Sequence, residues 1–191
     1  MPTLPDLTWP MRTERLSVRP AVEADLERIW QVRRQESVGR WMTDASKDLD
    51  AFVALAHEVK RVESTLILER DGGYVGETML RIEDAYAQSE VKEQAIGVNA
   101  EIGWCLDPAY EGNGYATEAA REMLRISFAE LGLHRVTALC FAGNTASWRL
   151  MERIGMRREA HHVGDSLHRE LGWVDGYVYA MLADEWRALQ A

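Results

Sequence analysis

Residues 109–124, AYEGNGYATEAAREML, place two glycines directly before a run of strong helix formers. The first turn of a helix leaves backbone N–H groups unpaired at the positive end of the helix dipole. At Gly112 and Gly114 a ligand can approach these groups closely, because glycine has no Cβ atom. A strand, a glycine loop and a helix in this order are therefore typical of a phosphate site. A turn that only needs positive φ explains the same glycines, and both interpretations stay open on the loop alone.

Two common nucleotide-binding motifs do not fit this loop. A P-loop requires Lys-Ser or Lys-Thr after its glycines, and neither follows here. A dinucleotide site requires a third glycine where this chain has Thr117. It also requires an acidic residue about 20 positions later, where residues 131–135 contain none. The loop therefore matches neither a P-loop nor a dinucleotide-binding motif.

Hydrophobic periodicity predicts a mixed α/β fold in one domain that covers residues 1–191. Strands are expected at 14–20, in two segments joined by the Asp-Gly-Gly turn at 71–73, at 100–107, at 134–141 and in a terminal pair at 157–164 and 176–182. Helices are expected at 22–35, 46–62, 116–131, 144–156 and 184–189. Ser46 is the expected N-cap of the second helix, and the apolar strand at 134–141 is expected to be buried on both faces. Residues 84–97 are polar and weakly periodic, so we expect a loop or flap there.

The composition is that of an ordinary globular protein, with 47% hydrophobic and 28% charged residues in a chain of 191. No apolar run reaches about 18 residues, and the N-terminus lacks a basic region followed by an apolar one. We therefore expect no membrane span, no secretory signal and a cytoplasmic location. The two cysteines, Cys105 and Cys140, lie in apolar runs, so we expect buried, reduced thiols rather than a disulfide framework.

The formal net charge of −9 argues against a nucleic-acid partner, which would select a basic surface. Such a charge suits a cationic or amine-bearing partner through long-range attraction. A negative surface also aids solubility by itself, and the charge alone does not separate these two explanations.

The segment EGNGYATEA, with the strand AEIGWCL before it and NTASWRLMERIGM after the next strand, resembles the GNAT superfamily of acyl-CoA-dependent N-acetyltransferases. Within it, the chain resembles the RimJ/RimL-like branch of ribosomal-protein N-terminal acetyltransferases, from about Thr13 to GYVYAMLADEW. The resemblance implies an acyl-CoA N-acyltransferase fold. Its mixed central sheet of about seven strands would be flanked by helices, with the fourth and fifth strands splayed apart. It also implies a cofactor-binding core at about 98–156, with acceptor-side elements at about 22–62, 84–97 and 157–182.

The resemblance implies acetyl-CoA as cofactor. Backbone N–H groups in the loop would hold its pyrophosphate. The strand around Trp104, Cys105 and Leu106 would splay from the strand at 136–141, and the pantetheine arm would lie in that gap and pair with the backbone like an extra strand. Asn144 would contact the same arm. The implied cofactor residues are Trp104, Cys105, Leu106, Glu111, Gly112, Asn113, Gly114, Tyr115, Ala116, Thr117, Asn144 and Ser147.

Glu111 departs from the family pattern, which carries Gln or Arg at this position. A carboxylate beside a pyrophosphate is repulsive unless it points away or pairs with a cation. Most of the implied site is backbone, so we expect weaker cofactor binding rather than none.

Amide formation requires a base that takes a proton from the amine, and Glu101 is the first candidate. It begins the strand that would run beside the acetyl group and would share a face with Gly103 and Cys105. A partly buried carboxylate there has a raised proton affinity. An edge glutamate paired with an arginine explains the same residue, Glu77 is a weaker candidate, and a chain of waters would serve as well.

The leaving thiolate needs a proton, and many family members use a tyrosine seven residues after the asparagine. This chain has Met151 there. Ser147 is the alternative hydroxyl, which would hydrogen-bond the coenzyme sulfur. A helix cap by Thr145 or by Ser147 is the competing explanation. The oxyanion donor would be a backbone N–H in the strand at 102–106.

The segment EAHHVGDSLHRE contains three histidines, but their spacing fits no metal site and we expect no metal. His162 is a candidate for lining the acceptor pocket instead. Trp41, Trp173 and Glu77 are further acceptor-site candidates.

Together these features predict transfer of an acetyl group from acetyl-CoA to a primary amine by direct attack in a ternary complex. The branch resemblance favours a protein or peptide N-terminus, and a small amine of the aminoglycoside or polyamine kind is the alternative acceptor. A non-catalytic module that binds acyl-CoA or a partner stays open because of Glu111 and the absent tyrosine. Exposed strand ends often pair between copies, which leaves a homodimer open.

Overall fold

The computed structural model describes residues 3–44, 46 and 48–190. Packing of the backbone divides this part of the chain into two compact units. Residues 3–80 and 104–122 form one, here the N-terminal unit, and residues 81–103 and 123–190 form the other, here the C-terminal unit. The predicted single domain at 1–191 stays a prediction, and each unit is described by itself below.

The strands form a mixed sheet in the order β1-β2-β3-β4-β5-β6-β8-β7. This sheet has eight strands, and the α/β class is confirmed. The additional strand is β1 (Met11–Arg12), which has two residues and is too short for an alternating pattern to reveal.

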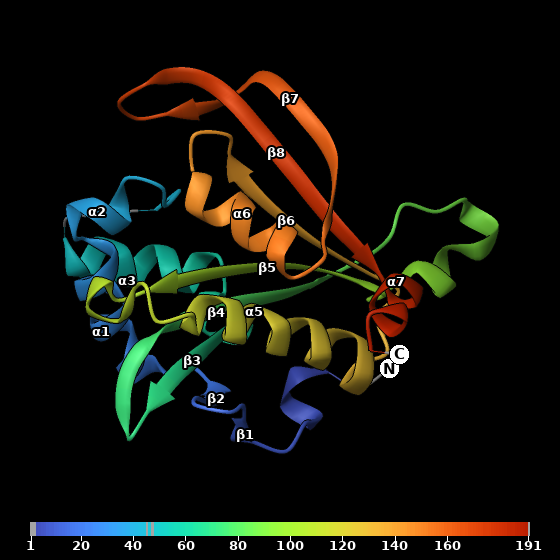
Figure 1. The fold of residues 1–191 in the computed structure, drawn as a ribbon, viewed down its shortest axis with the longest axis horizontal. Coiled ribbons are helices and arrows are strands. Elements are labelled where there is room, and N and C mark those ends of the chain that lie inside the picture. Colours follow the sequence, from blue (N-terminus) through green and yellow to red (C-terminus); the bar gives the residue numbers. More distant parts are fainter. Residues whose placement is uncertain (1–2, 45, 47, 191) are drawn as a thin grey trace. The chain divides into compact units, whose positions relative to one another are not determined.

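In the N-terminal unit, β2 (Ser17–Pro20), β3 (Thr65–Arg70) and the first part of β4 (Gly73–Glu83) pair antiparallel. The helices of this unit are α1 (Leu26–Arg33), α2 (Glu36–Gly39), α3 (Leu49–Glu58), α4 (Arg61–Ser64) and the start of α5 (Tyr115–Arg125). Figure 1 shows α1, α2 and α3 grouped together in blue and cyan. Their apolar faces bury a core formed by Ala21, Leu26, Ile29, Phe52, Ala56 and Ile67.

Two predicted helices are shorter than the periodicity indicated. The first begins at Leu26, after a single 3₁₀ turn at Glu23–Asp25. The second divides into α3 and α4 at Lys60, whose φ of 50° lies in the left-handed region. The predicted N-cap is also wrong, because the Asp48 side chain accepts the hydrogen bond from the backbone N–H of Ala51. The hydroxyl of Ser46 donates instead to Asp44.

In the C-terminal unit, β6 (Arg135–Phe141) pairs along its whole length with β8 (Gly172–Leu182), which pairs with β7 (Arg157–His168). A π-helical turn (Ile126–Glu130) follows α5, and α6 (Thr145–Arg153) and α7 (Ala183–Ala188) complete the unit. Both hairpin strands extend past the predicted 157–164 and 176–182. Residues 163–165 lie in an irregular part of β7, because the pairing register shifts between His162 and Ser166.

The predicted burial of β6 on both faces is wrong. Val136 and Ala138 are fully buried, whereas Leu139 in the same strand is 53% exposed. This alternation shows that only one face of the strand is packed.

Residues 84–97 form a loop that contains one 3₁₀ segment (Ser89–Ala95), and Figure 1 shows it in green. Its base is closed by a hydrogen bond from Ala85 N to Ala95 O and another from Gly97 N to Asp84 Oδ1. The loop itself is therefore confirmed, and its role as a flap stays a prediction.

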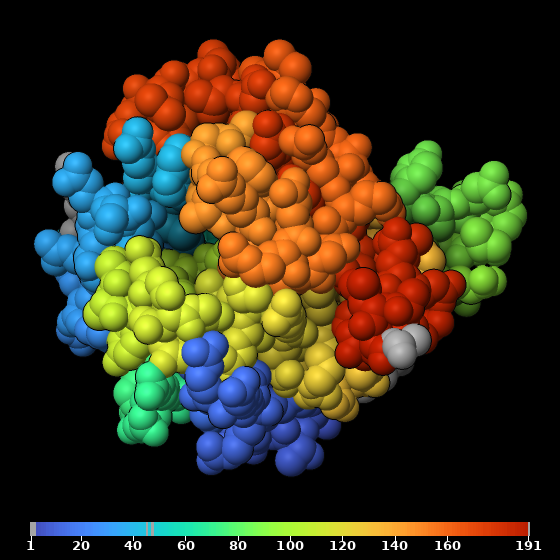
Figure 2. Space-filling model, viewed as in Figure 1, coloured from blue at the N-terminus to red at the C-terminus, as the bar shows by residue number. Residues whose placement is uncertain are grey.

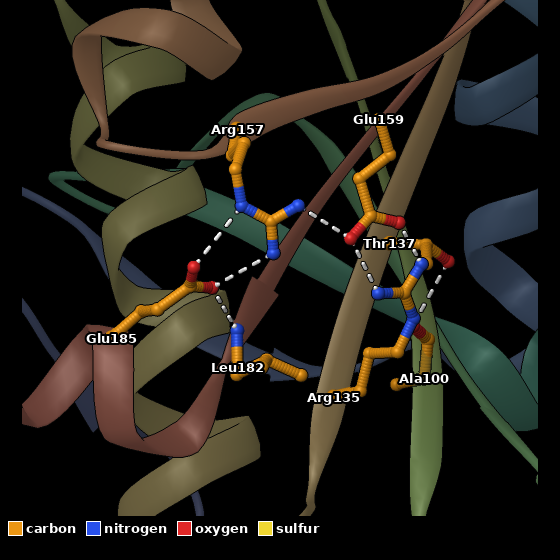
Figure 3. Close-up of polar contacts among 7 residues, drawn as sticks. All are labelled: Ala100, Arg135, Thr137, Arg157, Glu159, Leu182 and Glu185. Atoms are coloured by element: carbon orange, nitrogen blue, oxygen red, sulfur yellow. Dashed lines mark hydrogen bonds and ion pairs between the residues drawn. The ribbon is translucent and has the colours of Figure 1, made fainter.

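Charged side chains connect β6, β7 and α7 (Figure 3). Arg135 donates to both carboxylate oxygens of Glu159, and Arg157 Nη1 donates to Glu159 Oε1 over 2.6 Å. Arg157 also donates to Glu185, which in turn accepts from the backbone N–H of Leu182. The hydrogen bonds from Arg135 and Arg157 outweigh desolvation and lower the pKa of Glu159 to about 2.

In the described part of the chain, no helix has the length and apolar character needed to cross a bilayer.

Candidate active site

The glycine loop of the N-terminal unit adopts backbone conformations that favour glycine. Gly112 has a φ of 76° and Gly114 a φ of 81°. A Cβ atom at Gly112 would meet no heavy atom within 4 Å, so conformation rather than space requires glycine there. Residues 111–114 are exposed, and Figure 2 shows the yellow-green segment that contains them at the surface.

Three carbonyl groups of this loop, those of Tyr110, Glu111 and Asn113, accept side-chain hydrogen bonds. Asn113 Nδ2 donates to the carbonyl oxygens of Tyr110 and Glu111 over 3.2 and 3.0 Å. Arg15 Nη1 donates to Asn113 O over 2.9 Å. By contrast, the N–H groups of Gly112, Asn113 and Gly114 donate to no acceptor within the described residues. The loop thus presents donors just before the first turn of α5, which is the arrangement that binds an anion.

The predicted contact by Tyr115 is limited to its backbone, because its side chain is only 3% exposed. Its hydroxyl accepts a hydrogen bond from Arg70. The guanidinium carbons of Arg15 and Arg70 lie 4.7 and 5.6 Å from the centre of its ring. The two arginines were not singled out from the sequence, because their contacts join segments far apart in the chain.

Glu111 is exposed, and its side chain pairs with no cation among the described residues. The compensation that would remove its repulsion toward a phosphate is therefore not supplied by an ion pair. Thr117 is buried, and Ala116 is half-buried in the first turn of α5.

Strand β5 (Asn99–Leu106) carries the other predicted cofactor residues. Trp104 and Leu106 are half-buried and Cys105 is buried. Burial, followed by the nearby charge of Glu77, raises the pKa of Cys105 to about 12, so its thiol is neutral. The neighbouring strand approaches so closely that a Cβ atom on Gly76 would lie 2.4 Å from Cys105 O. That close approach leaves no signal in the sequence around Gly76, because it depends on strand pairing.

The expected common face of Glu101, Gly103 and Cys105 stays a prediction: Glu101 and Gly103 are half-buried, and Cys105 is buried. Ala100 and Ile102 are buried, and the next buried residue of β5 is Cys105. The alternation of buried residues along β5 is therefore interrupted between Ile102 and Cys105.

Glu101 belongs to the C-terminal unit. It has features both of a catalytic base and of an edge glutamate paired with an arginine. Its Oε2 accepts from Arg81 Nη2 at 2.5 Å, which is the ion pair of the structural explanation. Burial nevertheless raises the pKa of Glu101, with Arg81 acting in the opposite direction and Glu83 in the same one. The parallel ladder between β5 and β6 ends at the pair Glu101 and Thr137, although both strands continue. Such a short ladder is what a splay between these strands requires.

Asn144 is the N-cap of α6, because its Oδ1 accepts from the backbone N–H of Ser147 over 3.3 Å. The predicted cap by Thr145 or Ser147 is therefore wrong. Burial raises the pKa of Cys140 to about 11, and the hydroxyl of Ser147 acts in the opposite direction. Both cysteines are free thiols, but the predicted burial is wrong for Cys140, which is only half-buried.

Glu77 is 2% exposed, and its Oε1 accepts from Arg33 Nε over 2.5 Å. Its Oε2 and the hydroxyl of Tyr74 are buried without a hydrogen-bond partner in the described residues. Trp41, in the same N-terminal unit, is half-buried beside the guanidinium group of Arg40.

The two acceptor candidates of the hairpin are exposed. The Trp173 side chain is 68% exposed, and His162 lies 3.6 Å from the carboxylate of Asp165. His161 pairs with Asp175 over 2.6 Å. Among residues 3–44, 46 and 48–190, no three His, Cys, Asp or Glu side chains gather as a metal site.

The sequence model of the Acetyltransferase (GNAT) domain family matches residues 15–157 of this chain. The "Uncharacterized N-acetyltransferase YnaD" of Bacillus subtilis is 31% identical over 91% of this chain and 97% of its own length. The "Putative ribosomal N-acetyltransferase YdaF" of the same species is 26% identical over 91% of this chain and 94% of its own length.

Solved structures share the fold. A GNAT-family acetyltransferase from Bacillus anthracis has a TM-score of 0.73 and 28% identity, covering 91% of this chain and 98% of its own. The spermidine N-acetyltransferase of Vibrio cholerae, crystallised with CoA and spermine, has a TM-score of 0.76 and 20% identity, covering 92% of this chain and 99% of its own.

Proposed function

Because the chain belongs to the GNAT acetyltransferase family, we propose that it acetylates a primary amine at the N-terminus of a protein or peptide. Acyltransferase activity and the use of acetyl-CoA follow from the family itself. The acceptor is the proposal, and its support is the likeness to YdaF, whose name describes a ribosomal N-acetyltransferase. The observation that carries the cofactor site is the loop at 112–114, whose N–H groups donate to no acceptor among the described residues, while the carbonyls of Asn113 and Gly114 are hydrogen-bonded.

These residues fit a pyrophosphate, because backbone donors at a helix N-terminus bind anions without a basic side chain. The N–H groups of Gly112, Asn113 and Gly114 would hold it, together with those of Ala116 and Thr117. Bound acetyl-CoA supplies a thioester, which is an activated acetyl group. The residues of the chain must then orient the amine and move its proton.

Glu101 is the proposed base. Its Oε2 is held by Arg81, and its Oε1 has no hydrogen-bond partner among the described residues. Oε1 would take the proton from the acceptor ammonium, directly or through a water. The raised pKa of Glu101 suits this role, because it brings proton affinity closer to neutrality.

Glu101→Gln tests this role. We expect kcat/KM to fall by about 100-fold, because the amide cannot accept the proton, while the Kd for CoA is unchanged. In the natural protein kcat/KM should rise as pH rises through the raised pKa of Glu101. Arg81→Gln removes the charge that opposes this shift, so its profile should lie at higher pH. An unchanged profile in both variants would leave water as the base.

Ser147 is proposed to hydrogen-bond the sulfur of the leaving thiolate. Its hydroxyl already acts on a sulfur atom, because it opposes the rise in the pKa of Cys140 that burial causes, and this supports the proposal. Ser147→Ala should lower kcat more than it changes KM for acetyl-CoA, and equal activity would remove Ser147 from the mechanism.

A small polyamine is the second candidate acceptor, favoured by the net charge of −9, which attracts polycations. Release of free thiol from acetyl-CoA, with N-terminal peptides and with spermidine as acceptors, distinguishes the two. Faster release with peptides supports the main proposal, and release with spermidine alone overturns it.

The homodimer and the cytoplasmic location stay predictions.

The cofactor site is tested by calorimetric titration of acetyl-CoA into the natural protein and into Glu111→Gln. We expect binding by both, with a gain of about threefold in the variant, because an exposed repulsion is strongly screened. Absence of binding by both proteins would overturn the cofactor site.

A further inference from the structure

A segment far from the glycine loop in sequence holds it in place. Arg15 Nε donates to Glu118 Oε2 and Arg15 Nη1 to Asn113 O, over 2.7 and 2.9 Å. The backbone N–H of Arg15 and the hydroxyl of Thr13 both donate to Glu118 Oε1. Figure 2 shows the blue N-terminal segment beside the yellow-green loop. We call Thr13–Arg15 with its bonds to Asn113 and Glu118 the clamp.

The bond to Asn113 O decides where the loop points its donors. In a trans peptide, the carbonyl of one residue and the N–H of the next point in opposite directions. When Arg15 binds Asn113 O, the N–H of Gly114 is therefore directed away from Arg15. A Cβ atom on Gly114 would lie 3.5 Å from Arg15 Nη2, so Arg15 occupies one side of the loop. The donor lies on the other side, where no described residue accepts it.

The bond to Glu118 removes a charge conflict. Glu118 is in the first turn of α5, where its carboxylate would compete with a bound anion for the positive helix end. Arg15 binds Glu118 through two guanidinium nitrogens, and the Glu118 side chain is only 13% exposed. Although desolvation acts to raise it, hydrogen bonds from Thr13 and Arg15 lower the pKa of Glu118. The carboxylate is thus charged, and the arginine neutralises it.

We propose that the clamp shapes the anion site and that Arg15 is a positioning residue for acetyl-CoA, which it does not need to touch. Its guanidinium group aligns the Asn113–Gly114 peptide and compensates Glu118, so that backbone donors and the helix end face the pyrophosphate. This inference rests on the proposed use of the loop for acetyl-CoA. It assigns a cofactor role to side chains of the N-terminal segment.

The test compares three single variants by calorimetry with CoA and by steady-state kinetics. Arg15→Gln should weaken CoA binding by about tenfold, because the loop must then be ordered on binding. It should raise KM for acetyl-CoA while kcat at saturation changes by less than about twofold. Arg15→Lys should lose nearly as much, because one ammonium cannot bond Glu118 and Asn113 O as a planar fork does.

Arg19→Gln is the matched control. Arg19 also bonds carboxylates, those of Asp25 and Glu69, within the same unit. Its variant should lose comparable thermal stability and keep the CoA affinity of the natural protein within about twofold. Thermal unfolding of each variant shows whether it is folded.

The outcomes separate this inference from the proposed function. If the natural protein does not bind CoA, the proposed function fails. If it binds and folded Arg15→Gln binds equally, or if Arg15→Lys keeps the natural affinity, the clamp is overturned. If kcat falls while KM is unchanged, or if Arg19→Gln weakens CoA binding equally, the positioning role is overturned as well.

Discussion

Helices α5 and α6 begin in opposite ways. Helix α6 is capped locally, since Asn144 satisfies the N–H of Ser147 three residues on. Helix α5 follows glycines that offer no capping side chain, and its support comes from Arg15, 103 positions from Glu118. A locally capped helix start has fewer donors for a ligand, whereas the N–H groups of Gly112, Asn113 and Gly114 before α5 donate to no acceptor among the described residues. The difference shows how one common element serves stability in one place and ligand binding in another.

The largest expected effect comes from changing the conformation of the glycine loop before α5. Gly114→Ala puts a Cβ on a residue with a φ of 81°, a strain of about 1–2 kcal/mol that the backbone can relieve by rotating. We expect CoA affinity to fall by about 30-fold, because rotation misdirects the loop donors. Calorimetric titration measures this change.

Gly172→Ala is the control for Gly114→Ala. Gly172 has a φ of 72° with open space around its Cβ position, and it lies in the hairpin turn of the C-terminal unit. The substitution carries the same strain, so thermal stability should fall while CoA affinity stays the same. Equal loss of affinity in both variants would show that strain alone, and not the loop, determines binding.

A smaller effect on cofactor binding is expected at the start of α6, which Asn144 caps. Asn144→Ala removes the cap and should cost about 1 kcal/mol of unfolding free energy, whereas Asn144→Asp keeps the cap. Both variants lose the side-chain amide donor that is predicted to contact the pantetheine arm. We expect KM for acetyl-CoA to rise about threefold in both, with Tm lowered only in the alanine variant. Unchanged KM in Asn144→Asp would make Asn144 a cap alone.

The smallest effect leaves both helix starts untouched. The pKa of Glu159 is about 2 in the folded protein, below its ordinary value of 4.5. The stabilisation is therefore complete above pH 4.5 and is lost as pH falls toward 2. Because Glu159 is partly exposed, we expect only about 1 kcal/mol from it, and Glu159→Gln should remove this pH dependence from denaturant unfolding without changing CoA binding. A variant that retains the natural dependence would contradict the assignment.

The sequence by itself determined the local features. Positive φ at Gly112 and Gly114, the helix that follows and the alternating strands depend on neighbouring residues, so their patterns are readable in order along the chain. The resemblance to the GNAT superfamily depends on the same local motifs, and the family match confirms it, whereas the RimJ/RimL-like branch stays a prediction. A local signal gave the wrong residue where two nearby side chains could both cap a helix: Asp48 caps α3, and Ser46 does not.

Only the tertiary structure decided which charges meet. Arg81 with Glu101, Arg33 with Glu77 and Arg15 with Glu118 are separated by 20, 44 and 103 positions. An arginine can reach many carboxylates, and nothing in its neighbouring residues selects one of them. The selection follows from strand pairing and helix packing, which bring distant backbone segments within the reach of a side chain. For this reason the loop was predicted from its glycines, whereas the clamp that holds it was found only in the folded chain.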